Sequence, residues 1–516
     1  MTEMIGGWLL PLIYATGCVL ACCRVQRYWA VARLTAAAAL AATAAAAAVA
    51  LLWSRWGEVA VDALGLTAAM LVAVLGWVVI NYSARYLSGE PGQARFVRAL
   101  LFTLSAVGLL VVSRHLAVMV LAWTATSLGL HHLLTFYRER KAAQVVAHKK
   151  FLVSRCAEAC LLVALLLVYQ SAGTLSLQGL DGFLATVDSL PLSLHAAALL
   201  FALAAILKTA QLPLHGWLIQ VMEAPTPVSA LLHAGVVNIG GFVLIRLAGL
   251  LSLAPAAQTL LVVVGSLTAV LAGLVMLTRI SIKVRLAWST CAQMGFMLME
   301  IGLGLYELAL LHLVAHSLYK AHAFLAAGDT VQTAREGDLL AAGRASRSPL
   351  WYLAALALSG GVVAGSAALW QLVLPALAVP LVALFIVALG LAALLWFEYA
   401  APPVLLRGTL QVAALTQLYL LWHLLFAGLA PAPAAVAWPL VLWVAISFTL
   451  FYVAQVWLRC YPQGRFARTV YPWAYCGFYL DETFTRLTFR IWPLQLSPIQ
   501  AQTLTNRIPL MQGNRL

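Results

Sequence analysis

The sequence predicts an all-α polytopic membrane protein, and three observations lead to this fold class. First, 64% of the 516 residues are hydrophobic, only 9% are charged, and the mean hydropathy is +0.95. Soluble domains contain about 45–50% apolar and about 25% charged residues, so a soluble protein is excluded, and disorder is excluded by the high hydrophobicity. Second, the apolar residues form runs of membrane-spanning length. Third, the basic residues gather in alternate loops.

A membrane-spanning helix needs about 20 mostly apolar residues. Fifteen runs meet this need, and the alanine-rich second run is a good helix former with small packing surfaces. The predicted spans are residues 4–23, 33–53, 61–82, 98–113, 115–137, 151–171, 194–222, 226–250, 257–278, 284–304, 306–328, 350–374, 377–399, 409–430 and 433–457.

The basic residues predict the topology. The loops after spans 1, 3, 5, 9, 11 and 13, together with the C-terminal tail, hold 25 of the 31 Lys and Arg residues. By the positive-inside rule, this places the N-terminus outside and the C-terminus in the cytoplasm, with an odd number of spans. The net charge of +14 is therefore explained by topology, and no nucleic-acid partner is expected.

Three of the remaining basic residues, Arg155, Lys208 and Lys320, lie within predicted spans or at their edge. Ionisable groups at that depth are costly and indicate function. In the seventh span, Pro213 follows Lys208 and should break the helix, as in transporters whose broken helices line polar cavities. Burial readily neutralises a lysine, which suits reversible protonation. The alternative is a structural lysine that caps the freed carbonyls.

Span 11 carries His312, His316 and Lys320 at i, i+4 and i+8, so the three share one helical face. This stripe predicts a proton relay with coupled protonation of His316 and Lys320, although a structural polar stripe is the alternative. We also place His233, in span 8, on the pathway. The secondary pathway candidates are His215, Asn238 and Glu300. The histidines and the eight scattered cysteines show no paired-ligand signature, so no metal site is expected in this chain.

Glu158, in span 6, is the carboxylate that we expect to pair with Lys208. The alternative is an intrahelical ion pair with Arg155, three residues earlier on the same face. Glu300, near the outer end of span 10, is either an outer portal or a boundary residue in contact with water. The sequence does not decide which carboxylate is the proton inlet.

Residues 208–218 and 222–234, with Lys283–Thr290 and His312–Lys320, resemble the signature of the antiporter-like subunits of respiratory complex I and Mrp antiporters. The resemblance covers about residues 60–370. It implies two inverted five-helix repeats, each with a discontinuous helix, and proton translocation along a buried polar axis. The predicted units are residues 1–97 (spans 1–3), 98–250 (first repeat), 251–400 (second repeat), 401–458 (spans 14 and 15) and 459–516 (cytoplasmic amphipathic tail).

Two positions depart from the family pattern. The chain has Trp123-Thr124 where the family has Trp-Glu, and span 12 lacks the family's exit lysine within Gly361–Ser366. Both departures argue against a complete pump of the complex I type.

The tail from Gly477 to Pro493 predicts an amphipathic helix. It is either a membrane-surface anchor or a docking helix for a partner, through Asp481, Glu482, Arg486 and Arg490. The tail, the short chain and the absent lysine together resemble the membrane subunits of inorganic carbon accumulation complexes. That resemblance implies a soluble or peripheral zinc partner of the DabA type with a β-carbonic-anhydrase-like site. The zinc would belong to the partner, and no cofactor is expected in this chain.

The sequence thus predicts a proton-conducting subunit, not itself an enzyme, that energises CO2-to-bicarbonate accumulation in a bacterial inner membrane. One alternative is an antiporter-like subunit of a quinone oxidoreductase or hydrogenase complex, or an Mrp-type antiporter. Another is a non-conducting membrane anchor. The axis offers mostly His and Lys rather than the oxygen ligands that Na+ prefers, which favours H+.

Overall fold

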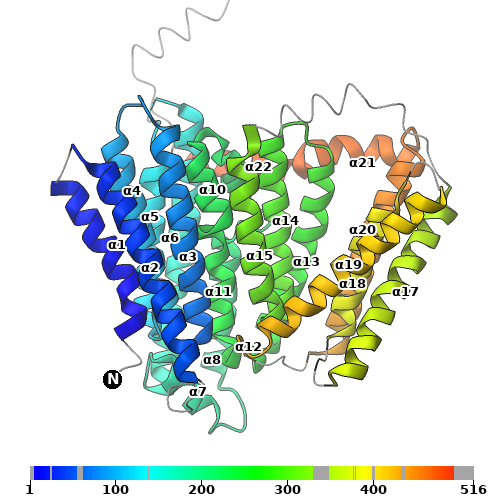
Figure 1. Ribbon diagram of the computed structural model, residues 1–516, viewed down its shortest axis with the longest axis horizontal. Coiled ribbons are helices and arrows are strands. Elements are labelled where there is room, and N and C mark those ends of the chain that lie inside the picture. The colour runs from blue at the N-terminus through cyan, green and yellow to red at the C-terminus, as the bar shows by residue number, and fades with distance from the viewer. Residues whose placement is uncertain are drawn as a thin grey trace, which may run out of the picture.

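Long apolar helices, most of them aligned side by side, make up the molecule (Figure 1). The computed structural model describes residues 5–23, 26–54, 62–137, 139–328, 348–375, 377, 379–397, 401–431 and 436–492. Among these residues there is no strand, and β-type pairing is limited to one isolated bridge between His115 and Ser176. The chain is therefore an all-α, multi-pass membrane protein, as the sequence predicts.

The first six helices form one side of the bundle (Figure 1). Local signals set several of their ends: the Asp62 side chain accepts a hydrogen bond from the Gly65 amide (3.0 Å) at the start of α3, and Gly173, with φ +66°, ends α6. The helices are α1 (Ile5–Cys23), α2 (Tyr28–Ser54), α3 (Ala63–Tyr86), α4 (Gln93–Val112), α5 (Leu116–Leu134) and α6 (Lys141–Ala172).

The next two spans are interrupted. A short helix, α7 (Leu177–Leu184), lies at the end of the bundle opposite to the C-terminal helices and was not predicted (Figure 1). The seventh span consists of α8 (Leu192–Lys208), an irregular stretch, α9 (Gly216–Ile219) and a 3-10 turn at Gln220–Glu223. The eighth consists of α10 (Thr226–Ala234), a 3-10 turn at Val236–Asn238, α11 (Ile239–Arg246) and α12 (Ala248–Ser252).

The centre of the molecule contains α13 (Pro255–Leu277), α14 (Ile282–Gly302) and α15 (Tyr306–Leu325). Glycines let α13 and α14 approach closely: a Cβ at Gly265 would meet the Gly295 carbonyl, and a Cβ at Gly295 would meet the Gly265 carbonyl. Small residues play this role in membrane helix pairs because lipid supplies no hydrophobic force between helices.

Four further helices stand on the other side of α13–α15 (Figure 1). They are α17 (Pro349–Val373), α18 (Leu381–Ala392, followed by a 3-10 turn at Ala393–Leu395), α19 (Pro402–Phe426) and α20 (Trp438–Cys460). Helix α19 runs diagonally and contacts α15. The bond from the Gly428 amide to the Glu307 carboxylate (2.9 Å) secures the end of this diagonal.

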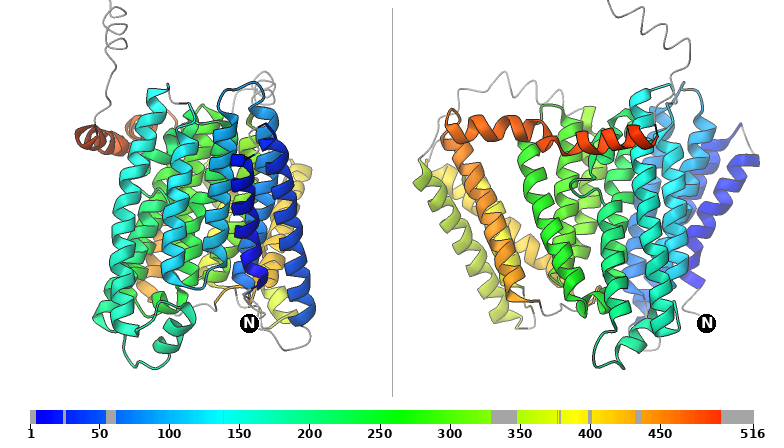
Figure 2. Two further views of the ribbon diagram at one scale, coloured as in Figure 1. Left: turned by 90° about the vertical axis from the view of Figure 1, so that its left-hand side faces the viewer. Right: turned by 180° about the vertical axis from the view of Figure 1, so that it is seen from behind.

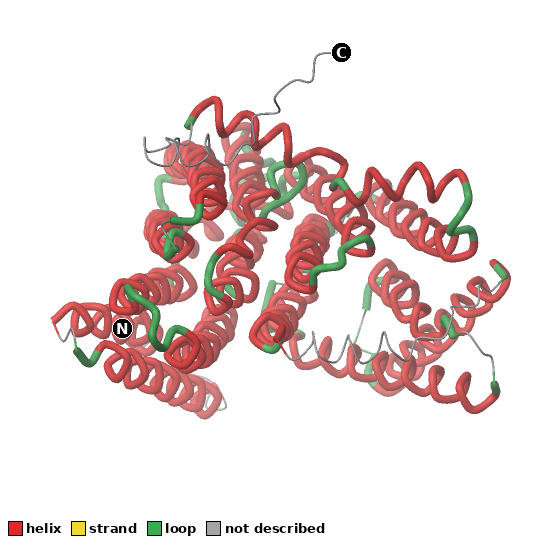
Figure 3. Tube along the Cα trace, turned by 90° about the horizontal axis from the view of Figure 1, so that it is seen from above, coloured by secondary structure: helices red, strands yellow, loops and turns green. Residues whose placement is uncertain are grey.

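The chain then turns across the bundle. Helices α21 (Arg465–Tyr475) and α22 (Leu480–Ile491), joined by a 3-10 turn at Gly477–Tyr479, lie across the direction of the spanning helices (Figure 2). Viewed from that end, most spanning helices are seen end-on (Figure 3). Helix α1 begins at the opposite end of the bundle.

Each of the fifteen predicted spans overlaps one or more helices. Within the described ranges, ten helical segments are long and apolar enough to cross a membrane, and three shorter apolar helices add to them. The main differences are that α6 begins at Lys141 rather than at 151, and that two helices rather than one follow α20. Parts of the prediction lie outside the described residues: positions 4, 61, 378, 398–399 and 433–435 of the predicted spans, and residues 493–516 of the predicted tail. The division into repeats stays a prediction.

Candidate functional site

The break in the seventh span positions Lys208. Pro213 has no amide hydrogen and its ring clashes with the carbonyl four residues earlier, and α8 ends at Lys208. The freed backbone groups find side-chain partners: the Cys291 thiol donates to the Ala210 carbonyl (3.2 Å) and the Thr268 hydroxyl accepts from the Leu212 amide (3.3 Å). Irregular backbone at membrane depth requires such partners, and Lys208 is therefore not needed to cap the break.

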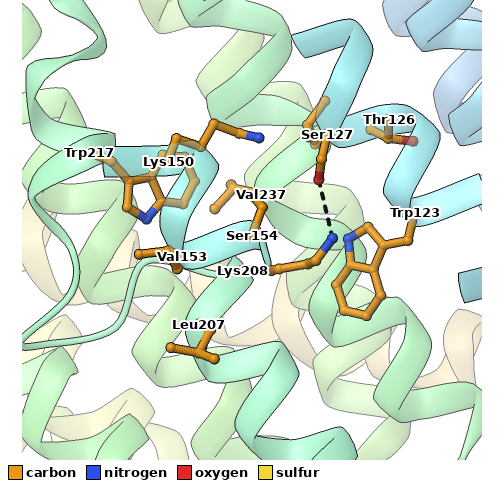
Figure 4. A pocket seen from close by; sticks show the side chains of 11 residues that line it. Trp123, Thr126, Ser127, Lys150, Val153, Ser154, Leu207, Lys208, Trp217 and Val237 are labelled. Atoms are coloured by element: carbon orange, nitrogen blue, oxygen red, sulfur yellow. Dashed lines mark hydrogen bonds between the residues drawn. The ribbon is translucent and has the colours of Figure 1, made fainter. Parts of the chain in front are cut away.

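The Lys208 ammonium instead points into a cavity between α5, α6 and α8 (Figure 4). It donates to the Ser127 hydroxyl at 3.1 Å and to Glu158 Oε1 at 3.3 Å, and it lies 4.9 Å from the centre of the Trp123 ring. In place of the family's span-5 carboxylate, α5 thus offers a hydroxyl and an aromatic face. Ser127 was not singled out from the sequence, because a lone serine in an apolar helix carries no signal.

Glu158 pairs with two cations at once. Its carboxylate lies 2.8 Å from the Arg155 guanidinium and 3.3 Å from the Lys208 ammonium. The two alternatives left open by the sequence therefore occur together. Glu158 is 8% exposed and Lys208 is also 8% exposed, so water screens this pair weakly.

Two lysines that the sequence placed in a cytoplasmic loop are buried in the structure. Lys149 and Lys150 belong to α6, and their exposed fractions are 0% and 7%. The loop assignment was wrong because hydropathy cannot tell a helix end covered by other elements from one in water. Lys150 lines the same cavity as Lys208 (Figure 4).

A second polar cluster lies on α14 and α15. The Glu300 carboxylate is 2.9 Å from Nδ1 of His312, and the rings of His312 and His316 are 6.0 Å apart. Lys320 donates to the Leu286 carbonyl at 2.9 Å and to the Ser289 hydroxyl. The predicted stripe therefore exists as a contiguous face, and Glu300 joins it.

The eighth span completes this cluster. His233 stacks on Phe324 with ring centres 4.4 Å apart, and the Asn238 amide donates to the Ser317 hydroxyl at 2.7 Å. Within the described residues, no ring nitrogen of His233 or His316 makes a hydrogen bond. Histidine titrates near physiological pH in water, which makes these two imidazoles candidates for proton transfer.

The 3-10 turn at Val236–Asn238 connects the two clusters. Val236 and Val237 line the Lys208 cavity, and Asn238 belongs to the α15 cluster. His215, by contrast, lies outside both: its Nδ1 is 3.3 Å from the Pro213 carbonyl, and its ring centre is 4.8 Å from that of Trp288. Nowhere in the described ranges do three or more His, Cys, Asp or Glu side chains gather as they would around a metal ion.

The tail differs from the expectation at Asp481. Its carboxylate accepts hydrogen bonds from Lys149 (2.9 and 3.0 Å) and from the Gln220 amide (2.8 Å), and it occupies the space where a Cβ at Gly216 would lie. Asp481 therefore fastens α22 to the bundle. Its side chain is still 29% exposed, and its part in partner docking stays a prediction. Its three companions do face outward: Glu482, Arg486 and Arg490 are exposed.

A multi-pass helical protein with broken helices and a buried row of carboxylates, lysines and histidines defines the antiporter-like class of membrane subunit. The family described as "NADH:quinone oxidoreductase/Mrp antiporter, TM" matches residues 113–396, and "NADH-Ubiquinone oxidoreductase (complex I), chain 5 N-terminus" matches residues 57–97. The chain therefore belongs to the antiporter-like subunits of complex I and Mrp antiporters, and among them to the DabB family of inorganic carbon transporter subunits, as its relatives show.

The "Probable inorganic carbon transporter subunit DabB" of Hydrogenovibrio crunogenus is 42% identical over 87% of this chain and 86% of its own length. The corresponding DabB2 of Halothiobacillus neapolitanus is 41% identical over 84% of this chain and 81% of its own. NADH-quinone oxidoreductase subunit L of Escherichia coli is 33% identical over 57% of this chain and 49% of its own.

Solved structures share the fold. A chain of the Mrp complex from Dietzia matches 99% of this chain and 57% of its own length, with a TM-score of 0.54 and 22% identity. A chain of an archaeal membrane-bound sulfane sulfur reductase matches 93% of this chain and 95% of its own length, with a TM-score of 0.57 and 17% identity.

Proposed function

We propose that this chain is the proton-conducting membrane subunit of an inorganic carbon accumulation complex in a bacterial inner membrane. Its partner would be a DabA-type zinc protein that hydrates CO2 to bicarbonate at a β-carbonic-anhydrase-like site. Proton flow through this chain would make that step directional. The N-terminus would face outward and the C-terminus the cytoplasm.

One observation carries the proposal: titratable side chains are retained in two buried clusters beside broken helices. Keeping ionisable groups at membrane depth costs several kcal/mol or more, so such groups mark ion pathways. Glu300, His312, His316 and Lys320 follow one another along α14 and α15, and Glu158 with Lys208 forms the other cluster. A mere anchor for an enzyme would need neither.

Coverage of the relatives favours carbon accumulation over the respiratory alternative. The alignment spans 86% of the carbon transporter subunit but only 49% of the complex I subunit. The span-12 segment also lacks the exit lysine that the complex I type carries. In the described part of α17, Ser359 and Ser366 make hydrogen bonds there instead, to the Ala388 carbonyl and with the Gln417 amide.

The test has two parts. Co-purification of the chain with its partner, followed by metal analysis, should find zinc in the partner and none in this chain purified alone. Uptake of labelled inorganic carbon by cells that express both chains should be abolished by Lys208→Ala while the complex still assembles. Wild-type uptake in that variant would refute proton conduction. Neighbouring genes that encode quinone-oxidoreductase subunits would support the respiratory alternative.

A further inference from the structure

A second amine shares the cavity of Lys208. The cavity is small and has room for about one water molecule. Its lining includes Lys150 and Lys208, together with the hydroxyls of Ser127 and Ser154. Figure 4 shows the Lys150 and Lys208 side chains lining the cavity, with the Ser127 hydroxyl bonded to Lys208. A water molecule in this space lies beside the lining groups, which include both amines.

Among the described residues, Lys150 has no counter-charge of its own. Within the described ranges its ammonium makes no hydrogen bond or ion pair, and the ring contact that involves it is with Trp217, whose centre is 5.9 Å away. The charges that act on it are two of like sign, Lys208 and Arg155, and one of opposite sign, Glu158. Glu158 is already held by the other two. A buried side chain of this kind is stable when it can lose its charge, which lysine can do and arginine cannot.

The position of Lys150 gives the arrangement a direction. Lys150 lies eight residues before Glu158 on α6, which is about 12 Å along the helix axis. Helix α6 begins at the end of the bundle that carries α22, because Lys149 of α6 bonds Asp481 of α22. Near Lys150, the half-buried His131 of α5 interacts electrostatically with it and packs on Phe151. The groups therefore lead from the membrane interior toward that end.

We propose that Lys150 is a proton carrier between Lys208 and the end of the bundle that holds α22. A proton leaves the Lys208 ammonium, passes through cavity water and binds the Lys150 amine, so one N–H bond breaks, one forms and one positive charge moves. Lys150 then passes the proton on toward His131. The inference rests on the proposed proton conduction and gives that conduction an exit that does not need the missing span-12 lysine.

Three substitutions of one residue test the proposal. Lys150→Arg keeps the positive charge but cannot release a proton, and Lys150→Gln keeps neither property. Both should reduce inorganic carbon uptake by about a hundredfold or more, the lower end of the effects expected for proton-transfer groups. Lys150→His restores a titratable group and should recover part of the uptake. Arg98→Gln, at an exposed position on α4, is the matched control and should retain full uptake.

Assembly is measured first, by co-purification with the partner, so that a folding defect is separated from a conduction defect. Proton flux into vesicles that contain the purified complex gives a second readout for variants whose host cells grow poorly. Wild-type uptake in Lys150→Arg would overturn the proposal and indicate a fixed charge, for instance one that holds a small anion in the cavity. Wild-type uptake in Lys150→Gln would overturn it as well.

The Lys150 and Lys208 variants together distinguish a failure of this proposal from a failure of the proposed function. If Lys208→Ala abolishes uptake while the Lys150 variants retain it, only the exit through Lys150 fails. If Lys208→Ala also retains uptake, proton conduction through this chain fails with it.

Discussion

The pairing of Glu158 with two cations predicts an asymmetry that a double-mutant cycle can measure. The Lys208 ammonium and the Glu158 carboxylate are 3.3 Å apart, and their side chains are 5% and 10% exposed. At that separation, and with an effective dielectric constant of about 20, their Coulomb attraction is about 5 kcal/mol. Removing one partner of a buried pair costs about 3–5 kcal/mol, because the other is left unpaired.

The two single variants should differ. Glu158→Gln deprives both Lys208 and Arg155 of their carboxylate and should cost about 3–5 kcal/mol of stability. Lys208→Met leaves Glu158 paired with Arg155 at 2.8 Å and should cost less. Adding Lys208→Met to Glu158→Gln should recover about 2 kcal/mol, because the unpaired ammonium is removed. The coupling energy is this recovery plus the cost of Lys208→Met alone, and residues in contact show coupling energies of about 0.5–3 kcal/mol. All three variants should lose inorganic carbon uptake.

The chain contains its own probe for this measurement. Cys291 is fully buried and bonds the Ala210 carbonyl in the break after Lys208, so its thiol reacts only when this region opens. With the other cysteines replaced, the rate of Cys291 labelling in the purified complex reports the stability of the site. Recovery of about 2 kcal/mol corresponds to about a thirtyfold slower labelling of the double variant than of Glu158→Gln. Equal costs for the two single variants, or strictly additive costs, would refute the shared-carboxylate arrangement.

Three further results are expected. Gly216→Ala should release α22 from the bundle, because the Asp481 carboxylate occupies the space of the new Cβ. Protease cleavage of α22 would reveal the release. The control is Gly182→Ala, whose new Cβ meets no atom within 4 Å and which should leave α22 resistant. Arg486→Glu should weaken co-purification with the partner without altering the thermal stability of this chain, because the Arg486 side chain is 83% exposed; unchanged co-purification would count against docking at this face. His316→Gln should reduce uptake by about a hundredfold or more while the complex assembles, because it removes a titratable group from the α15 relay. Full uptake would exclude His316 from the pathway.

The residues themselves predicted much of the fold, because span length and charge bias are local properties. Twenty apolar residues must form a helix in lipid wherever they stand in the chain, and all fifteen predicted spans overlap helices. The break after Lys208 was also predictable, since Pro213 disrupts its own helix regardless of the surroundings. Spacing alone placed His312, His316 and Lys320 on one face of α15.

Other features depend on which helices become neighbours, and no local pattern encodes that. Glu158 was expected to bind either Arg155 or Lys208, and only packing of α6 against α8 shows that it binds both. The sequence predicts Lys149 and Lys150 to be loop residues, but in the structure α22 and α9 cover the end of α6 and bury them. The sequence predicts Asp481 to be part of an outward-facing surface, and only the fold shows that it bonds Lys149, 332 residues away in the sequence. Burial and counter-charge are properties of the tertiary structure, because the free energy of an ionisable group depends on which atoms surround it rather than on its sequence neighbours.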